Sequence, residues 1–250
     1  MKKRVQEEPQ PGDELSPAGE TVSPDVADVP LTEDLALSQL KRRDLGPDQI
    51  QQIVQDADLM KARKVRLVLA GHPQTPRRLA LRIIRELYTL ELMRFALAIG
   101  PAADLRRIAD ELLVGRLATI SLGEKISLAR RSSEMVAGAL LLDKEKRVWS
   151  VALENPRMTE RAVVKALQKS SASVGFVGTV SQHPKWCVRP EVSTALLRNA
   201  HTPLARAIEF ASRVPPKRLR DILHASHLPD SIKRYLRAGL RRPRHDDESR

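Results

Sequence analysis

One pattern recurs along the chain and limits what it can fold into: an apolar helical segment, a tight connection that often carries Pro, then Thr or Ser at the start of another helix. It occurs around residues 65–76, 148–159 and 192–203. Thr is favoured at a helix N-cap because its oxygen accepts a backbone hydrogen bond, and Pro fits the first helical position. We therefore expect Thr75 to cap a helix with Pro76 as its first residue, and we expect helices in series.

A fourth helix start follows from the capping-box pattern of Ser121 and Glu124, which precedes a further apolar segment. Taking Thr75, Ser121, Thr159 and Thr202 as equivalent starts, the separations are 46, 38 and 43 residues. A repeat built from one helical hairpin in the HEAT or armadillo style spans about 40–47 residues. The spacing therefore predicts one helical hairpin per unit.

The remaining apolar segments also have helical spacing, and no pair of segments has the alternation of a strand pair. Aromatic residues make up 3% of the chain, so Leu, Ala, Val and Ile must fill a core drawn from 42% hydrophobic residues. We predict an all-α fold. The further helices are expected at residues 32–40, 47–57, 102–117, 133–142, 174–181, 204–213, 216–224 and 229–240.

The segment 148–163, with its Asn155-Pro156 connection and its Thr159 cap, resembles a unit of the leucine-rich-repeat-variant and HEAT-like families. The similarity covers roughly residues 60–240. It implies a HEAT/armadillo-like α-solenoid, which is a superhelical stack of helical hairpins. Such families include scaffolds, adaptors and some nucleic-acid-processing proteins.

Composition divides the chain into three parts. Residues 1–30 are dense in Pro, Glu, Asp and Ser and hold few bulky apolar residues, so we predict a disordered acidic tail. Residues 31–240 are expected to form the helical-repeat domain, and residues 241–250 a frayed charged tail.

The charge is unevenly divided. The chain carries a formal net charge of +12, but residues 1–40 hold three Lys or Arg against nine Asp or Glu, a net charge of −6. The rest holds 40 basic and 22 acidic residues, a net charge of +18. Segments of opposite sign attract, so the acidic tail is a candidate intramolecular competitor for whatever the basic part binds.

The sequence favours a cytoplasmic protein that is not inserted in a membrane. Its one cysteine, Cys187, excludes an intramolecular disulfide and suits a reducing compartment. The basic residues at the N-terminus are followed by polar and acidic residues rather than by the apolar segment of an export signal. No run of about 18 apolar residues is present.

Catalytic motifs are absent from the sequence: there is no Gly-x-Ser-x-Gly, no phosphate-binding glycine loop and no His-Glu-x-x-His. We therefore predict no enzymatic activity and no cofactor. His72, His183 and His201 recur in the connections and are interpreted as turn residues. His183 and Cys187 have the spacing of a metal-ligand pair, but no further ligand lies nearby in sequence, so no metal is predicted.

Lys and Arg recur in clusters, and a feature repeated once per unit of a stack would form a stripe. Such a stripe would attract acidic protein segments or phosphate backbones. The alternative is that these residues are solvated outer faces of helices. The predicted basic surface consists of Lys61, Arg63, Lys64, Arg66, Arg78, Arg82, Arg85, Arg130, Arg131, Lys144, Lys146, Arg147, Lys217, Arg218 and Arg220.

Two functions remain open at this stage. The first is a non-catalytic scaffold or adaptor that binds an acidic partner protein through the basic surface. The second is a nucleic-acid-binding HEAT-like protein that contacts the phosphate backbone. Salt-titrated binding to random DNA and RNA separates the two, because phosphate contacts weaken steeply as salt rises. The sequence leaves the oligomeric state open.

Overall fold

In the computed structural model, residues 31–241 are described, and they contain sixteen α-helices and no strand. The prediction of an all-α fold is confirmed for this part of the chain. The predicted tail at 1–30 and residues 242–250 of the predicted C-terminal tail lie outside the described residues. The helices are α1 (Glu33–Gln39), α2 (Pro47–Gln55), α3 (Ala57–Lys61), α4 (Arg63–Gly71), α5 (Arg77–Glu86), α6 (Thr89–Leu97), α7 (Ala103–Arg116), α8 (Leu122–Arg131), α9 (Glu134–Leu140), α10 (Lys146–Leu153), α11 (Glu160–Leu167), α12 (Val174–Gln182), α13 (Pro190–Arg198), α14 (Leu204–Ser212), α15 (Pro216–His224) and α16 (Asp230–Arg241).

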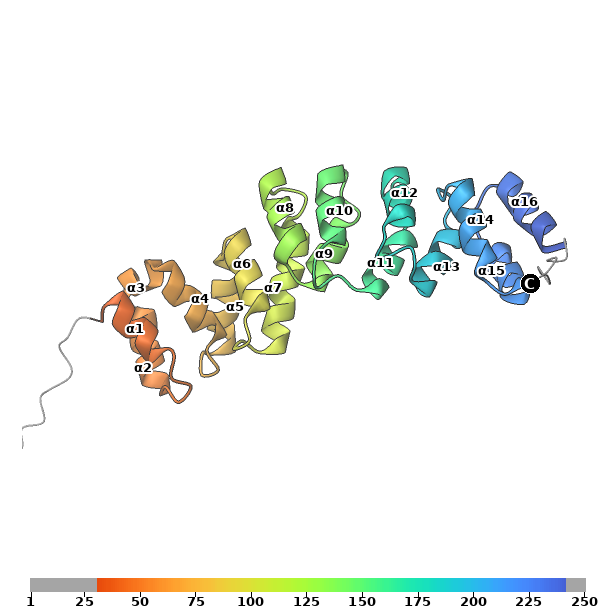
Figure 1. The fold of residues 1–250 in the computed structure, drawn as a ribbon. Helices are drawn as coiled ribbons and strands as arrows, with labels where there is room; N and C mark the ends of the chain where they lie inside the picture. The colour runs from red at the N-terminus through yellow and green to blue at the C-terminus, as the bar shows by residue number, and fades with distance from the viewer. Residues whose placement is uncertain (1–30, 242–250) are drawn as a thin grey trace, which may run out of the picture.

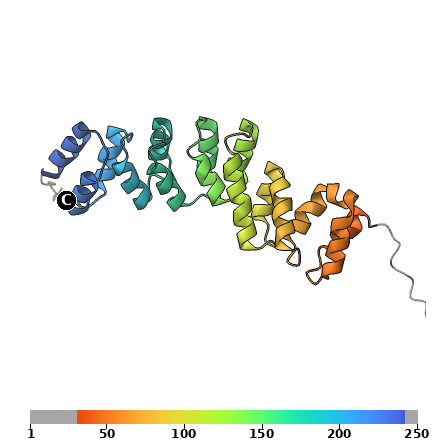
Figure 2. The same ribbon diagram turned by 180° about the vertical axis from the view of Figure 1, so that it is seen from behind.

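The helices follow one another along an elongated molecule, with α1 and α16 at opposite ends (Figures 1 and 2). From α4 onward they alternate between two layers. In the even layer, α4 packs on α6, α6 on α8, α8 on α10 and α10 on α12, and α14 packs on α16. In the odd layer, each helix from α5 to α15 packs on the next odd-numbered helix. Contacts are thus made between neighbours in sequence, as in a serial stack.

Side-chain caps begin several of these helices where the sequence predicted them. Thr32 accepts from the backbone N–H of Leu35, and Thr159 from that of Ala162. Ser121 accepts from the N–H of Glu124 (3.3 Å) while the Glu124 carboxylate accepts from the N–H of Ser121 (3.0 Å). The predicted capping box and both Thr caps are confirmed.

The predicted caps at Thr75 and Thr202 are wrong. The hydroxyl of Thr75 donates to the carbonyl oxygen of Leu69 (2.7 Å), and that of Thr202 to the carbonyl oxygen of Leu196 (2.6 Å). The Pro that follows each Thr is itself the N-cap residue, so α5 begins at Arg77, one residue later than predicted, whereas α14 begins at Leu204 as expected. Both Thr side chains are buried, and each hydroxyl gives a second hydrogen bond to a carbonyl near the end of the preceding helix, which already accepts from the N–H of His72 or Asn199.

The predicted equivalence of the four helix starts is also wrong. They precede α5, α8, α11 and α14, which is every third helix, so they fall alternately in the odd and the even layer. The separations of 38 to 46 residues therefore span three helices rather than one pair. Successive helices of the even layer, from α4 to α16, begin 24 to 33 residues apart, and this is the length of one helix pair.

The core lies between the two layers and is filled mostly by Leu, Ile, Val and Ala. Phe95, Phe176 and Phe210 are among its largest buried side chains, and Trp149 packs edge-on against Phe176 with ring centroids 5.9 Å apart. Each fully buried Leu, Ile or Phe contributes roughly 1.5–3 kcal/mol to folding. Apolar burial between neighbouring helices is therefore the main force along the stack.

His72, Asn155, His183 and Asn199 stand at equivalent places, at or just after the end of a helix. Each accepts a hydrogen bond at its side chain from the backbone N–H two residues later. The other end of each side chain bonds to an oxygen 26 to 32 residues earlier. His72 bonds to the carbonyl oxygen of Arg42 (2.8 Å), Asn155 to that of Ala129 (2.8 Å) and Asn199 to that of Leu167 (2.7 Å), while His183 bonds to the carboxylate of Glu154 (2.9 Å). These side chains join each connection to the preceding helix pair, which accounts for His72 and His183 as turn residues.

Candidate binding surfaces

The predicted basic cluster on α3 and α4 is largely neutralised by the protein itself. Lys64 has no ion pair within the described part of the chain and is exposed. The Arg66 side chain is only 19% exposed. The other three cations of the cluster each pair with an acid. These ion pairs are Lys61 with Asp58 (2.8 Å), Arg63 with Glu91 (4.0 Å) and Arg66 with Glu86 (2.9 Å).

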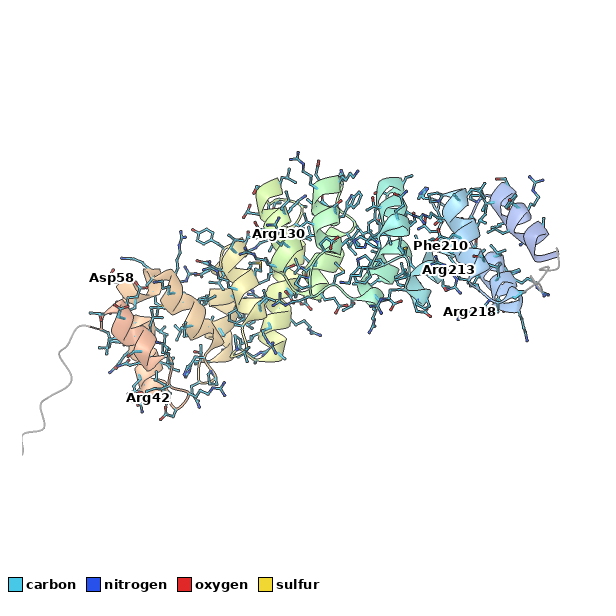
Figure 3. The ribbon with its side chains drawn as sticks, viewed as in Figure 1. Arg42, Asp58, Arg130, Phe210, Arg213 and Arg218 are labelled. Carbon is cyan, nitrogen blue, oxygen red and sulfur yellow. The ribbon has the colours of Figure 1, made fainter. Side chains whose placement is uncertain are left out.

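Two further predicted clusters lie in the odd layer, far apart. Arg78, Arg82 and Arg85 are exposed on α5. The other cluster, on α15, consists of Lys217, Arg218 and Arg220, of which Arg218 pairs with Glu191 of α13 (3.6 Å). Figure 3 places Arg218 near the C-terminal end of the stack and Arg130 near its middle.

The remaining predicted basic residues come together in the even layer, around two adjoining grooves. Lys144 lies in the connection before α10 and is exposed. The groove between α6 and α8, of about 220 Å³, is lined by Leu90, Met93, Arg94, Ile126, Ser127, Arg130 and Arg131. The groove between α8 and α10, of about 670 Å³, is lined by Leu122, Ile126, Glu145, Lys146, Arg147, Ser150 and Val151. Ile126 lines both grooves. We call the residues that line the two grooves the even-layer surface.

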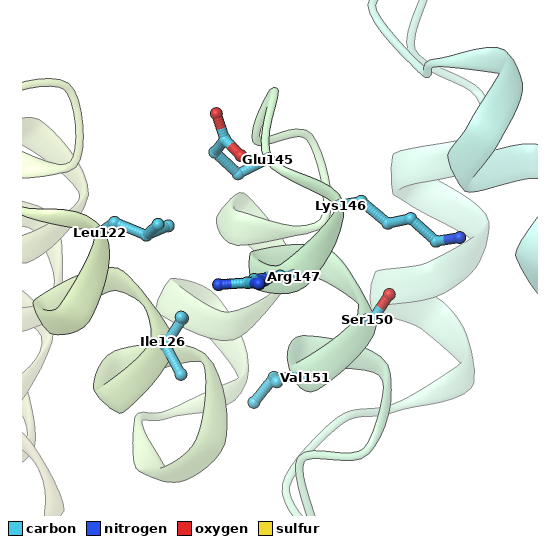
Figure 4. Close-up of a pocket in the computed structure, with 7 residues that line it drawn as sticks. All are labelled: Leu122, Ile126, Glu145, Lys146, Arg147, Ser150 and Val151. Atoms are coloured by element: carbon cyan, nitrogen blue, oxygen red, sulfur yellow. The ribbon is translucent and has the colours of Figure 1, made fainter.

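Apolar groups form the floor of the even-layer surface and cations its rim. Leu90 and Leu122 are 43% and 40% exposed although both are apolar. In Figure 4 the Arg147 side chain extends from α10 toward Leu122 and Ile126 of α8. Within residues 31–239, none of the rim cations makes an ion pair; they are Arg94, Arg130, Arg131, Lys146 and Arg147.

A partly buried ion pair fixes the connection that carries the cations of α10. Lys125 of α8 donates to the Asp143 carboxylate at 2.8 Å, and their side chains are 19% and 10% exposed. Burial alone would raise the pKa of Asp143, but the hydrogen bonds from Lys125 and from the N–H of Glu145 outweigh it, so the pKa lies below its usual value. Residues 143–147 are thereby held against α8.

Arg94 is the functional candidate that sequence reasoning missed on this surface. It stands among apolar residues in α6, so it forms no charge cluster in sequence. It joins Arg130 and Arg131 only because α6 packs on α8. A helical-wheel comparison of residues 89–97 could have placed it on the solvent side of the helix, but not beside α8.

A third groove lies in the odd layer, across α7, α9 and α11, and no sequence pattern pointed to it. Its volume is about 620 Å³. It is lined by Glu111, Val114, Glu134, Met135, Gly138, Ala139, Leu142, Arg161, Ala162, Lys165, Ala166 and Lys169, and we call it the odd-layer groove.

The described residues contain neither a cluster of metal ligands nor a helix that could cross a membrane. Among residues 31–241, no three His, Cys, Asp or Glu side chains gather as a metal site requires, and the His183 imidazole bonds to the carboxylate of Glu154. None of the described helices is long and apolar enough to cross a membrane. Comparison of the chain with protein-family models, curated proteins and solved structures gave no match.

Proposed function

We propose that this chain is a non-catalytic α-solenoid of the HEAT/armadillo-like kind, and that it acts as a cytoplasmic scaffold or adaptor by binding an acidic segment of a partner protein. The alternation of two helix layers, each packed serially, supports the solenoid assignment. A stack of this kind exposes long grooves between neighbouring helices, and such grooves suit extended or helical partner segments.

The observation that carries the proposal is the contrast between two basic clusters. On α3 and α4 the cations are mostly paired with acids of the chain. On the even-layer surface Arg94, Arg130 and Arg147 make no ion pair within the described residues, and exposed apolar side chains lie between them. Unpaired cations around an apolar floor fit a segment in which carboxylates flank bulky apolar residues.

The energies indicate that both parts of the surface are needed. An exposed ion pair contributes about 0.2–1 kcal/mol, so five such pairs supply only a few kcal/mol. Micromolar binding requires about 8 kcal/mol. Burial of Leu90, Leu122 and Ile126 by apolar residues of the partner is expected to supply much of the remainder.

A phosphate backbone is the alternative occupant, since it too would contact the rim cations. It would leave the apolar side chains of Leu90 and Leu122 uncovered, because it presents charged and polar groups to the protein. We therefore favour a protein segment and treat nucleic acid as an outcome of the test.

The test uses the full chain and two labelled probes: a flexible Gly/Ser peptide carrying Glu and Leu residues, and random-sequence 20-nucleotide RNA and duplex DNA. The triple variant Arg130→Glu, Arg131→Glu, Arg147→Glu should weaken peptide binding about tenfold or more at 100 mM salt. A matched control, Lys64→Glu, Arg78→Glu, Arg82→Glu, makes the same change in net charge elsewhere and should change it less than about twofold.

Equal weakening by both triple variants would reject a local site and leave only general electrostatic attraction. Tighter binding of RNA or DNA than of the peptide at 150 mM salt, with a steep salt dependence, would replace the protein partner with nucleic acid.

A further inference from the structure

The odd-layer groove differs from the even-layer surface in the size of its floor residues and in the placing of its charges. It crosses three consecutive helices of one layer, α7, α9 and α11. We infer that it is a second docking site, and that its occupant is an acidic amphipathic helix of a partner protein with small residues on its apolar face.

Small residues make the floor of the groove shallow and smooth. Gly138 and Ala139 of α9 and Ala162 and Ala166 of α11 line the groove, and a Cβ added at Gly138 would lie 3.4 Å from the Cβ of Ala162. The two helices therefore approach closely at this point. Met135, which is 43% exposed, stands at the side of this floor, and a long, flexible Met side chain adapts readily to a partner.

One edge of the groove carries a regular row of cations. Arg161, Lys165 and Lys169 follow one another at intervals of four residues along and just beyond α11, and all three are exposed. Within residues 31–239 none of them makes an ion pair. Side chains four residues apart on a helix are stacked on one face about 6 Å apart along its axis.

The carboxylates of the opposite edge are already engaged. Glu111 pairs with Arg107 of its own helix at 3.4 Å, and Glu134 accepts a hydrogen bond from the Thr159 hydroxyl at 2.5 Å. The groove therefore holds more unpaired positive than negative charge, and its positive charge lies along the cationic row. A nucleic-acid strand carries charge along its whole length and would bring phosphates against the two glutamates, whereas an amphipathic helix can turn its carboxylates toward the cationic row alone.

These features together select the occupant. A helix with Glu at positions i, i+4 and i+8 repeats the spacing of the cationic row, so it can place a carboxylate opposite each cation. Ala residues on its adjoining face would allow it to approach the floor formed by Gly138 and Ala162. The inference does not depend on the proposed function, because the two sites lie in different layers and share no residue.

The experiment uses the full chain and a labelled synthetic helix with Glu at i, i+4 and i+8 and Ala on the adjoining face. The triple variant Arg161→Glu, Lys165→Glu, Lys169→Glu should weaken binding about tenfold or more at 100 mM salt. Its control, Arg78→Glu, Arg82→Glu, Arg85→Glu, makes the same change on the same layer and should have less than a twofold effect. A peptide with Lys in place of Glu should bind the first variant better than it binds the native chain.

The inference is overturned by no binding of the native chain at 50 mM salt, by equal weakening in the control variant, or by no rescue by the charge-swapped peptide. Loss of helix binding in the even-layer variant Arg130→Glu, Arg131→Glu, Arg147→Glu, with none in the α11 variant, would assign the helix to the even-layer surface. That last result would leave the proposed function standing while removing the second site.

Discussion

The side chain of Asn155 donates from Nδ2 to the carbonyl oxygen of Ala129 at 2.8 Å, across 26 residues of sequence. The same amide approaches the carbonyl oxygen of Ser132 at 3.3 Å, and its Oδ1 accepts from the N–H of Arg157 at 2.7 Å. Asn155 is fully buried, so one residue satisfies the end of α8 and shapes the connection between α10 and α11. It joins two helix pairs with directional bonds that apolar packing cannot provide.

Replacing Asn155 with Ala should lower the free energy of unfolding by about 2–3 kcal/mol, because buried carbonyl and N–H groups lose their partners. Urea unfolding followed by circular dichroism measures the change. Asn155→Asp keeps the acceptor for Arg157 but brings a carboxylate against two carbonyl oxygens, so it should destabilise at neutral pH as well. The exposed Gln168→Ala serves as control and should stay within about 0.5 kcal/mol of the native chain. A similarly small effect of Asn155→Ala would show that these hydrogen bonds do not hold the two helix pairs together.

Local patterns were enough to predict most helices but not the layer to which each belongs. The caps at Ser121 and Thr159, and the Pro at the start of the helix 216–224, depend on residues within one turn of the helix. The connections before α5 and α14 look alike in sequence, each with Thr before Pro, yet one enters the odd layer and the other the even layer. Turn chemistry does not encode the layer, which is why the spacing of these helix starts overestimates the length of one helix pair.

The candidate sites, like the helices, could be predicted from sequence only where they depend on residues close together in the chain. Arg130 and Arg131 were predicted because they are neighbours in sequence, but their meeting with Arg94 depends on the packing of α6 on α8. The odd-layer groove depends on Gly138 and Ala162 lying together across two helices. Small residues at single positions carry no pattern in sequence, so such a groove becomes visible only in three dimensions.

Gly71 is expected to resist substitution because α4 ends against Pro101. A Cβ added at Gly71 would lie 2.8 Å from the Pro101 Cγ, which is too close for two carbon atoms. Gly71→Ala should lower the free energy of unfolding by about 1–3 kcal/mol, the usual cost of overpacking. Thermal unfolding of the full chain measures it.

The matched control is Gly115→Ala in α7, where nothing lies within 4 Å of an added Cβ. Because Ala favours a helix over Gly by about 1 kcal/mol, this variant should be stabilised or unchanged. If both variants shifted the melting temperature equally, the contact between Gly71 and Pro101 would not be the cause.

The Lys125–Asp143 ion pair should make stability depend on pH in the acid range. The pKa of Asp143 lies below its usual value, near 3.9 in an unfolded chain, so the pair stabilises the fold above about pH 4. That stabilisation is lost as the pH falls through the lowered pKa. The difference in unfolding free energy between the native chain and Asp143→Asn should therefore be largest near pH 7 and shrink below pH 4.

Asp58→Asn provides the comparison, since Asp58 also pairs with a lysine at 2.8 Å but both side chains are largely exposed. Solvent screens such a pair, so we expect Asp58→Asn to change the stability at pH 7 less than Asp143→Asn does. A difference for Asp143→Asn that stays constant from pH 3 to pH 7 would show that the carboxylate charge is not what stabilises the connection.

The acidic N-terminal segment is predicted to compete with a partner for the even-layer surface. Residues 1–40 hold nine Asp or Glu against three Lys or Arg. A tethered competitor acts at a high effective concentration, about millimolar for a short flexible linker, so weak attraction is sufficient. Deleting residues 1–30 should strengthen binding of the acidic Glu/Leu peptide several-fold at 50 mM salt, and the gain should vanish at 1 M, where the Debye length is about 3 Å.

A full-length variant with each Asp and Glu of residues 1–30 changed to Asn or Gln should behave like the deletion, since it removes the charge and keeps the chain. Unchanged affinity in both variants would exclude competition, whereas a gain in the deletion alone would point to steric blocking rather than to charge.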